Sequence, residues 1–470
     1  MSSKKLYPLF IFTLIFLSFS ADLTPTPEIL WASPPFSKVP LKMERPQFWI
    51  KKIQNPNQIL LSLDQIQKMN DENLKKPELY LCKVSEMKEE WTKEEVLSLL
   101  REDWEGFGRT EEVRYSRRGN PLGETFWNDL KENLNQGSLD EIIFIQFGLI
   151  LKRTDIRVFP TQEASLTSPH PYGFDRFQHS SLSPGALVGV FHRSKDNQWV
   201  YAQCGFIRGW IRLSDVAIAR KKSDAIEYDQ WKDRCVITNS FVPIYEDPKL
   251  KKKLFIAQMG SSFPLLTLSE KSGKALPYYV VKIPLRGNDG YLIFGKGYLS
   301  KKDGVHRGFL PYTQENIARQ AFKMLHEPYG WGEMFGGRDC SRFIMDIFST
   351  FGFHMPRNSK LQAMIGIPLL REGEDPPVGI KEILDKAIPL ATLLRFPGHI
   401  MLYLGKEKGK YYVIHSLYGI QKVGKGVFKM EKIGKVVVSD LSLGKNGVNG
   451  PLLDRITDIR IVALDSPVTE

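Results

Sequence analysis

The stretch GGRDCSRFIMDIF, residues 336–348, places one of only four cysteines where flexible chain turns into a helix. Asp339 is a good helix N-cap residue, and apolar residues follow it at spacings of three and four. This apolar stripe comprises Phe343, Ile344, Ile347, Phe348 and Phe351. Cys340 lies on the same stripe in the first turn, where the helix dipole and unpaired N–H groups lower the pKa of a thiol. Cys340 is therefore either ordinary core filling or a nucleophile.

Two histidines downstream favour the second interpretation. The stretch HIMLYLGKEKGKYYVIH, residues 399–415, has the pattern of a β-hairpin whose side chains alternate between faces. If Gly405 pairs with Gly409, His399 lies directly opposite His415 on one face. A register shifted by two leaves the histidines diagonal neighbours, and a one-residue slip puts them on opposite faces.

A cysteine helix packed on such a hairpin suits nucleophilic catalysis. One imidazole would take the thiol proton, and the other would orient the first. The remaining histidines are not predicted to lie beside a cysteine or a second histidine, so they are predicted to be structural or surface residues. His179, in the polar stretch DRFQHSS, is the one further candidate; the others are His170, His192, His306, His326 and His354.

Length and charge limit the classes of protein. A chain of 470 residues is too long for one core and predicts about three domains, with four possible. The formal net charge of +12 favours an anionic partner or surface. Nucleic-acid binding is disfavoured, because the chain has no arginine-rich arm and no aromatic-and-basic repeat.

The N-terminus predicts export. A basic start (MSSKK), an apolar run and a small-residue end (SFSA) form the layout of a secretory signal peptide over residues 1–21, cleaved after Ala21. The apolar run is shorter than the roughly 20 residues of a membrane span; an uncleaved anchor is the alternative. The expected location is the periplasm, the cell wall or the exterior. No C-x-x-C occurs, so a zinc site is not expected. Cys204 and Cys235 could pair, a point that the sequence leaves open.

The chain between the two ends changes pattern twice. Residues 22–150 are predicted to form a helical, stabilising domain, with Ser62 and Thr92 as helix caps. Short alternating strands then predict two small barrels, over residues 151–225 and 230–308. Residues 310–470 hold the cysteine helix and the hairpin.

The residues that carry the chemistry resemble a known family. YGWGEMFGGRDCSRFIMDIFSTFGFHMPRNSKLQ resembles the cysteine motif of the NlpC/P60 cell-wall peptidases, and PGHIMLYLG with YYVIH resembles their histidine motifs. The wider layout is similar to family members with a helical N-terminal domain, two bacterial SH3-like (SH3b) barrels and a C-terminal catalytic domain. The resemblance implies a multi-domain protein with an α+β papain-like catalytic domain.

The resemblance also implies roles and a substrate. Cys340 would be the nucleophile, His399 the general base and acid, and His415 the orienting residue. The substrate would be a peptidoglycan stem peptide, cut between γ-D-glutamate and the following diamino acid, often with a free N-terminal L-alanine. The implied substrate-binding residues are Tyr329 near the oxyanion, Asp339 and Ser341 at the substrate's amino end, and Asp175 from the first barrel.

Two residues depart from the motif. Arg342 stands where the family usually has glycine, and Glu333 replaces the glycine after WG. A long side chain at position 342 could crowd the cleft or select a different peptide.

The leading hypothesis is therefore a monomeric cysteine endopeptidase that needs no metal or other cofactor. Its lysine-rich charge would favour anionic cell-wall polymers. Two alternatives remain open: a catalytically silent wall-binding adaptor, and an N-acetylmuramoyl-L-alanine amidase or acyltransferase on the same fold.

Overall fold

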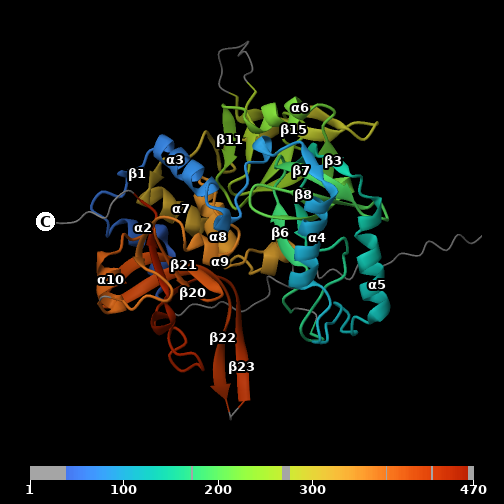
Figure 1. Ribbon diagram of the computed structural model, residues 1–470. Coiled ribbons are helices and arrows are strands. Elements are labelled where there is room, and N and C mark those ends of the chain that lie inside the picture. Colours follow the sequence, from blue (N-terminus) through green and yellow to red (C-terminus); the bar gives the residue numbers. More distant parts are fainter. Residues whose placement is uncertain (1–38, 171–172, 267–275, 377, 425–426, 464–470) are drawn as a thin grey trace, which may run out of the picture.

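A computed structural model describes residues 39–170, 173–266, 276–376, 378–424 and 427–463 (Figure 1). The predicted signal peptide, residues 1–21, lies outside the described residues. Within the described ranges, no helix is both long and apolar enough to cross a membrane.

The first barrel is one antiparallel sheet of seven strands in the order β10-β4-β7-β8-β9-β5-β6. Its strands are β4 (Gln146–Ile150), β5 (Thr154–Arg157), β6 (Gln178–Leu182), β7 (Leu187–Arg193), β8 (Trp199–Gln203), β9 (Arg208–Arg212) and β10 (Val216–Ile218). The predicted boundary at residue 151 cuts off β4. That strand pairs with both β7 and β10, and its Ile150 belongs to the core of the barrel.

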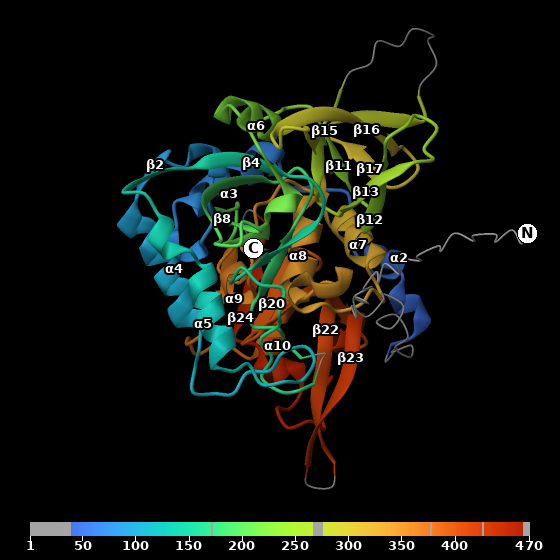
Figure 2. The same ribbon diagram turned by 90° about the vertical axis from the view of Figure 1, so that its right-hand side faces the viewer.

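A second β unit follows the short helix α6 (Lys222–Asp229) and contains two sheets, β14-β11-β17 and β13-β12-β16-β15. Its strands are β11 (Arg234–Ile237), β12 (Phe241–Tyr245), β13 (Lys253–Gln258), β14 (Ser262–Pro264), β15 (Tyr278–Arg286), β16 (Leu292–Ser300) and β17 (Val305–Arg307). It has its own apolar core around Cys235, Val242 and Phe263. Figure 2 shows this unit at the end of the molecule opposite the β22–β23 hairpin.

The C-terminal domain is built on a six-stranded antiparallel sheet in the order β19-β24-β20-β21-β22-β23. Its strands are β19 (Ile367–Leu370), β20 (Thr392–Phe396), β21 (His399–Glu407), β22 (Lys410–Gly424), β23 (Val427–Asp440) and β24 (Asp458–Ile461). The accompanying helices are α7 (Gln314–Lys323), η6 (Trp331–Gly336), α8 (Cys340–Ser349), α9 (Ser359–Gln362), α10 (Ile380–Lys386) and η7 (Leu452–Arg455). The predicted stripe of α8 packs on β21 and β22, where Ile344 and Phe348 share a core with Ile400, Leu402 and Ile414.

The N-terminal region is not the separate helical domain that the sequence predicts. Its first part packs into the C-terminal core, where Trp49 and Leu61 are buried, and β1 pairs with β18 (Tyr312–Thr313). This first part consists of η1 (Leu41–Glu44), α2 (Pro46–Ile50), β1 (Ile59–Leu61), α3 (Leu63–Leu74) and η2 (Pro77–Leu79). This first part therefore completes the core of the C-terminal domain. The second part completes a core on the first barrel, so the N-terminal region joins these two domains.

The second part of the N-terminal region covers the first barrel, through Leu100 of α4 and Trp127 of α5. It consists of η3 (Val84–Glu86), β2 (Glu90–Thr92), α4 (Lys93–Phe107), α5 (Glu124–Asn133), η4 (Gln136–Ser138) and β3 (Ile142–Phe144). The predicted caps are confirmed, because Ser62 and Thr92 both form capping boxes at the starts of α3 and α4.

Candidate active site

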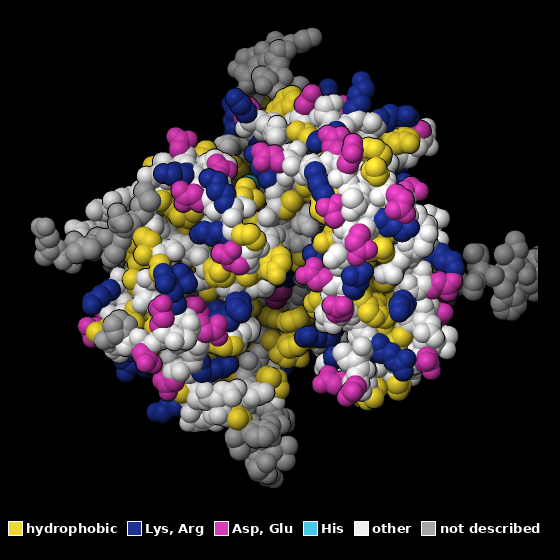
Figure 3. Space-filling view, in the orientation of Figure 1, with side chains coloured by type: hydrophobic (Ala, Val, Ile, Leu, Met, Phe, Trp, Pro, Cys, Tyr) yellow, Lys and Arg dark blue, Asp and Glu magenta, His cyan; other side chains and the backbone are white. Residues whose placement is uncertain are grey.

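Cys340 opens α8 at the wall of a cavity of about 650 Å³. The Asp339 side chain caps the helix by accepting a hydrogen bond from the Arg342 N–H (2.8 Å). The Cys340 thiol is 7% exposed and lies 4.0 Å from the carbonyl oxygen of Gly398, the residue before His399. Figure 3 shows this face hollowed between the C-terminal domain and the side that carries α4.

The hairpin that carries the histidines turns at Lys408 and Gly409, which both have positive φ (49° and 77°). Glu407 and Lys410 pair directly on either side of this two-residue turn. The predicted pairing of Gly405 with Gly409 is therefore wrong. Continued without interruption, the register of a two-residue turn would place His399 and His415 on opposite faces of the sheet.

A β-bulge corrects this register. Between Tyr403 and Gly405, strand β21 contains one residue more than its partner strand. Gly405 has a φ of 118°, a conformation that favours glycine. Beyond the bulge, the pairing makes His399 and His415 diagonal neighbours on one face, as the register shifted by two predicts.

The two imidazoles form a hydrogen-bonded chain with a serine. His399 Nε2 lies 2.7 Å from His415 Nδ1, and His415 Nε2 lies 3.1 Å from Ser439 Oγ on β23. Nδ1 of His399 has no hydrogen-bond partner among the described residues. The prediction that the histidines converge is confirmed. Ser439 was not predicted, because a serine in the strand KVVVSD carries no distinguishing pattern.

Burial keeps these groups neutral. It raises the pKa of the Cys340 thiol to about 12, and the nearby Asp339 carboxylate raises it further, against the N–H groups of Ile400 and Ser341. Burial also lowers the pKa of His399 to about 3 and that of His415 well below its usual value. The expectation that the helix start lowers the pKa of Cys340 is wrong, since desolvation outweighs the helix dipole.

The residues on either side of Cys340 lie in the cavity wall but are already paired. The Asp339 carboxylate accepts from Arg357 Nη2 (2.7 Å) and from the Ser341 hydroxyl (3.0 Å). Arg357 also donates to Ser341 Oγ (2.8 Å), so one guanidinium holds both residues. Arg357 was not predicted to belong to the site, although it stands in the quoted MPRNS stretch.

The other two predicted binding residues differ in position. Tyr329 lines the cavity beside Cys340. Asp175 does not line the cavity: its carboxylate is fully buried in the first barrel, 3.1 Å from Arg157. The prediction for Asp175 is therefore wrong, because the barrel's own arginine draws that side chain inward.

Helix α4 and the first barrel form the wall opposite Cys340. Glu102, Asp103 and Phe107 of α4 line the cavity, as does His179 of β6. Burial lowers the pKa of His179 to about 3, and its ring packs edge-to-face on Phe107 at 5.2 Å. No pattern in the sequence predicts α4 at the site, since only the fold brings it there.

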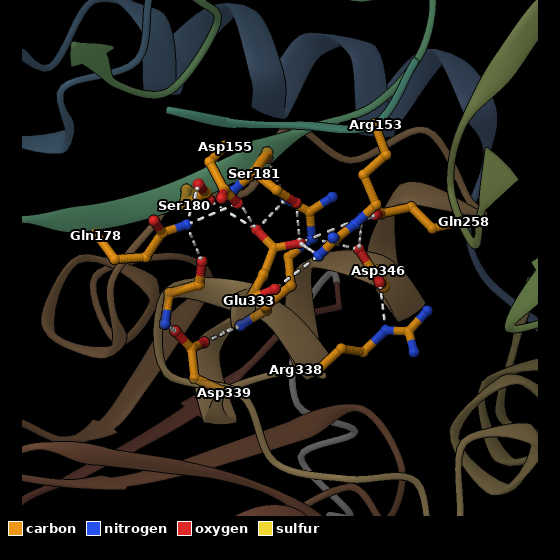
Figure 4. A network of polar contacts seen from close by, with 12 residues as sticks. Arg153, Asp155, Gln178, Ser180, Ser181, Gln258, Glu333, Arg338, Asp339 and Asp346 are labelled. Atoms are coloured by element: carbon orange, nitrogen blue, oxygen red, sulfur yellow. Dashed lines mark hydrogen bonds and ion pairs between the residues drawn. The ribbon is translucent and has the colours of Figure 1, made fainter. Parts of the chain in front are cut away.

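The two departures from the motif pair with each other, within a polar network in which Glu333 faces Ser180 and Ser181 (Figure 4). Arg342 Nη1 lies 2.9 Å from Glu333 Oε2, and the two side chains are 6% and 1% exposed. Glu333 also accepts from the hydroxyls of Ser180 and Ser181 on β6, at 2.7 Å each. The pair therefore joins η6 and α8 to the first barrel.

The same network continues along α8, away from the cavity. Asp346 accepts from Arg342 Nε and Arg338 Nε, at 2.6 Å each. Arg342 is absent from the lining of the cavity that Cys340 opens into. The expectation that Arg342 crowds the cleft is therefore wrong, because its carboxylate partners hold it on the barrel side of the helix.

The remaining cysteines are free thiols. Cys204 belongs to the core of the first barrel and Cys235 to that of the second unit, so the structure does not pair them.

Family models match two parts of the chain. The NlpC/P60 family matches residues 326–438, and an SH3 domain of the SH3b1 type matches residues 165–212. The chain therefore contains an NlpC/P60 catalytic domain of α+β, papain-like fold and an SH3b domain. A second SH3b barrel over 230–308 stays a prediction.

Relatives and a solved structure agree with these matches. Dipeptidyl-peptidase 6 of Lysinibacillus sphaericus is 27% identical over 248 residues, which are 51% of this chain and 82% of that protein. A gamma-D-glutamyl-L-lysine dipeptidyl-peptidase of Bacillus subtilis (strain 168) is 35% identical over 80 residues, 16% of this chain and 27% of that protein. An NlpC/P60 endopeptidase from Photobacterium damselae subsp. piscicida shares the fold, with a TM-score of 0.67 and 19% identity over 88% of this chain and 96% of that one. The chain is a cysteine-type peptidase.

Proposed function

We propose that this protein hydrolyses peptidoglycan stem peptides between γ-D-glutamate and the following diamino acid. The observation that carries the proposal is the chain His399–His415–Ser439, with the Cys340 sulfur beside the Gly398 carbonyl. The name of the Bacillus subtilis relative specifies a γ-D-glutamyl-L-lysine bond, which supports the choice of bond.

The proposed reaction is acyl transfer to Cys340. The thiol gives its proton to His399 Nδ1 as the sulfur attacks the amide carbonyl. The N–H groups at the start of α8 lack intrahelical acceptors and can stabilise the oxyanion. His399 then protonates the leaving amine. Water attacks the thioester, which releases the carboxylic acid and restores the thiol.

The hydrogen bonds of the histidine chain fix which nitrogens carry protons. For His399 to accept a proton at Nδ1, its Nε2–H must donate to His415 Nδ1. His415 Nε2–H then donates to Ser439 Oγ. His415 and Ser439 thus hold one tautomer of His399 and stabilise the imidazolium that forms during the reaction.

We also propose that the substrate needs a free N-terminal amine. Both relatives named above are dipeptidyl-peptidases. The residues that α4 and β6 contribute to the cavity wall support this requirement, because such a wall would limit the length of peptide ahead of the cut bond. Peptides with and without an N-acetyl group test this: the acetylated peptide is expected to be cut much more slowly.

Mass spectrometry of digested muropeptides tests the bond. The expected fragments are L-Ala-γ-D-Glu and a peptide that begins with the diamino acid, and Cys340→Ala abolishes both. Cys82→Ala removes a thiol outside the cavity and serves as the matched control. Release of the intact stem peptide indicates an amidase instead, and tight binding to sacculi without new amines indicates an adaptor. Cleavage by Cys340→Ala at the wild-type rate contradicts the proposed mechanism.

Export and wall binding are proposals of the same kind. The apolar start of the chain supports export through a signal peptide, residues 1–21. The net charge of +12 supports association with anionic wall polymers.

A further inference from the structure

The cavity that contains Cys340 is lined by three arginines, and only two of them have acidic partners. Arg357 pairs with Asp339 (2.7 Å), and Arg208 pairs with Asp103 (2.9 Å). Arg176, in the loop before β6, forms no ion pair or side-chain hydrogen bond with any of the described residues. Its guanidinium is the cation of this wall whose charge is not already cancelled.

The backbone that carries Arg176 is held in place even though its head group is free. The Arg176 N–H donates to the Ser165 carbonyl (2.9 Å), and the Trp331 indole N–H donates to the Asp175 carbonyl (2.9 Å). The Asp175 carboxylate turns into the barrel and accepts from the Phe177 N–H (2.9 Å). The next residue, Arg176, is exposed and faces the cavity. A fixed backbone with an unpaired guanidinium can bind an anion without reorganising the loop.

The proposed substrate supplies such an anion. A glutamate linked through its γ-carboxyl keeps a free α-carboxylate next to the bond that is cut, and the following diamino acid can supply a second one. Guanidinium groups bind carboxylates through two parallel N–H···O bonds. We propose that Arg176 binds a carboxylate that flanks the cut bond, and so selects acidic over amidated stem peptides; this inference rests on the proposed function.

Three peptides test the inference: L-Ala-γ-D-Glu-L-Lys, its D-isoglutamine analogue, and its C-terminal amide. The wild-type protein is expected to cleave the free acid with a kcat/KM about tenfold to a hundredfold above that of one of the two amides. The amide that is cleaved more slowly identifies which of the two carboxylates Arg176 binds. Arg176→Ala removes this preference by lowering kcat/KM for the free acid alone, mainly through KM, and Arg176→Lys restores part of it.

A matched control and a binding measurement keep the test decisive. Arg118 is exposed, forms no side-chain hydrogen bond or ion pair with the described residues and lies outside the cavity, so Arg118→Ala should leave all three rates unchanged. Calorimetry on Cys340→Ala measures the dissociation constants without cleavage. Equal affinities for acid and amides, or an equal loss for all three when Arg176→Ala is added, overturn the role of Arg176. If the free acid binds selectively but the wild-type protein cleaves none of the three peptides, the proposed function is contradicted and the role of Arg176 is still supported.

Discussion

The two sides of α8 carry buried polar clusters of opposite kinds. On the side of the hairpin lies a neutral cluster, in which His399 and His415 share a hydrogen bond and the Cys340 thiol lies beside the carbonyl of Gly398, the residue before His399. On the side of the barrel, Arg342 and Glu333 belong to an ionic cluster of permanent charges that neutralise one another. One helix of ten residues therefore serves both proton transfer and attachment.

The pKa shifts follow from this difference. Burial alone would raise the pKa of Glu333, but the guanidinium groups of Arg342 and Arg153 outweigh it and lower the pKa to about 2. No comparable counter-charge outweighs burial for His399, whose pKa falls to about 3. A group with a paired charge keeps that charge across physiological pH, whereas a group without one stays neutral and able to accept a proton. The comparison predicts that substitutions in the neutral cluster mainly lower activity, whereas substitutions in the ionic cluster mainly lower stability.

The largest expected effect is on catalysis, from breaking the neutral cluster. His399→Ala should lower kcat/KM about 10²- to 10⁴-fold, because general acid–base catalysis contributes about that much. The thermal unfolding midpoint should change little, since the ionic cluster is intact. Steady-state hydrolysis of a stem peptide measures the first quantity and calorimetry the second. His306→Ala, in the second β unit, is the control; activity within tenfold of wild type in His399→Ala contradicts the assigned role.

The next effect is on stability, from breaking the ionic cluster. Glu333→Ala removes one of the two carboxylates that pair with the buried Arg342 and leaves Asp346 as the other; breaking a buried ion pair in this way typically costs about 3–5 kcal/mol of the free energy of unfolding. The double variant Glu333→Leu with Arg342→Met removes both charges and should recover a large part of that loss. Chemical denaturation measures all three proteins. Equal stability of the single and double variants would show that the two side chains do not interact.

The sequence predicts the neutral cluster better than the ionic one, for physical reasons. The strand alternation around His399 and His415 and the helix stripe around Cys340 are local patterns, so they transfer directly into the fold. The bulge at Gly405 was not predicted, although two-residue turns and bulges decide register as strongly as alternation does. The histidines still share a face because the turn shifts the predicted register by three residues and the bulge shifts it back by one, which leaves a net shift of two.

The ionic cluster depends on contacts that no local pattern contains. Glu333 and Arg342 each look like a lone departure from the motif, and their partners Ser180 and Ser181 lie about 150 positions earlier in the chain. The split of residues 22–150 between two cores has the same origin. Both α4 at the cavity and Arg357 beside Asp339 are products of the tertiary fold.

Acidification should separate the clusters on the pH scale. The folded pKa of His399 lies far below the ordinary 6.5, so its stabilising effect is full above pH 6.5 and is lost as the pH falls toward 3. The loss is at most about 1.4 kcal/mol per pH unit for each such histidine. The contribution of Glu333 is lost only between its ordinary pKa of 4.5 and about 2.

Unfolding measured between pH 7 and pH 5 therefore separates the contribution of His399 from that of Glu333. Wild-type stability should fall over this range, and the fall should be shallower in His399→Gln, which has one titrating group fewer. The Glu333→Ala variant should keep the wild-type slope at a lower overall stability. Parallel curves for wild type and His399→Gln contradict a neutral, buried His399.

The smallest expected effect comes from the outer end of the neutral cluster. Ser439→Ala removes the acceptor of the His415 Nε2–H, a single hydrogen bond of 3.1 Å between buried groups. One such bond is worth about 0.5–1.5 kcal/mol, so kcat should fall about twofold to tenfold while KM stays unchanged. Ser439→Thr keeps the hydroxyl and should recover most of the rate, and Ser442→Ala, on the nearby turn, serves as the control. If Ser439 only fills space, kcat should be close to wild type in Ser439→Ala and lower in Ser439→Thr, because threonine is larger. That result would mean that Ser439 takes no part in the hydrogen-bonded chain, which would then end at His415.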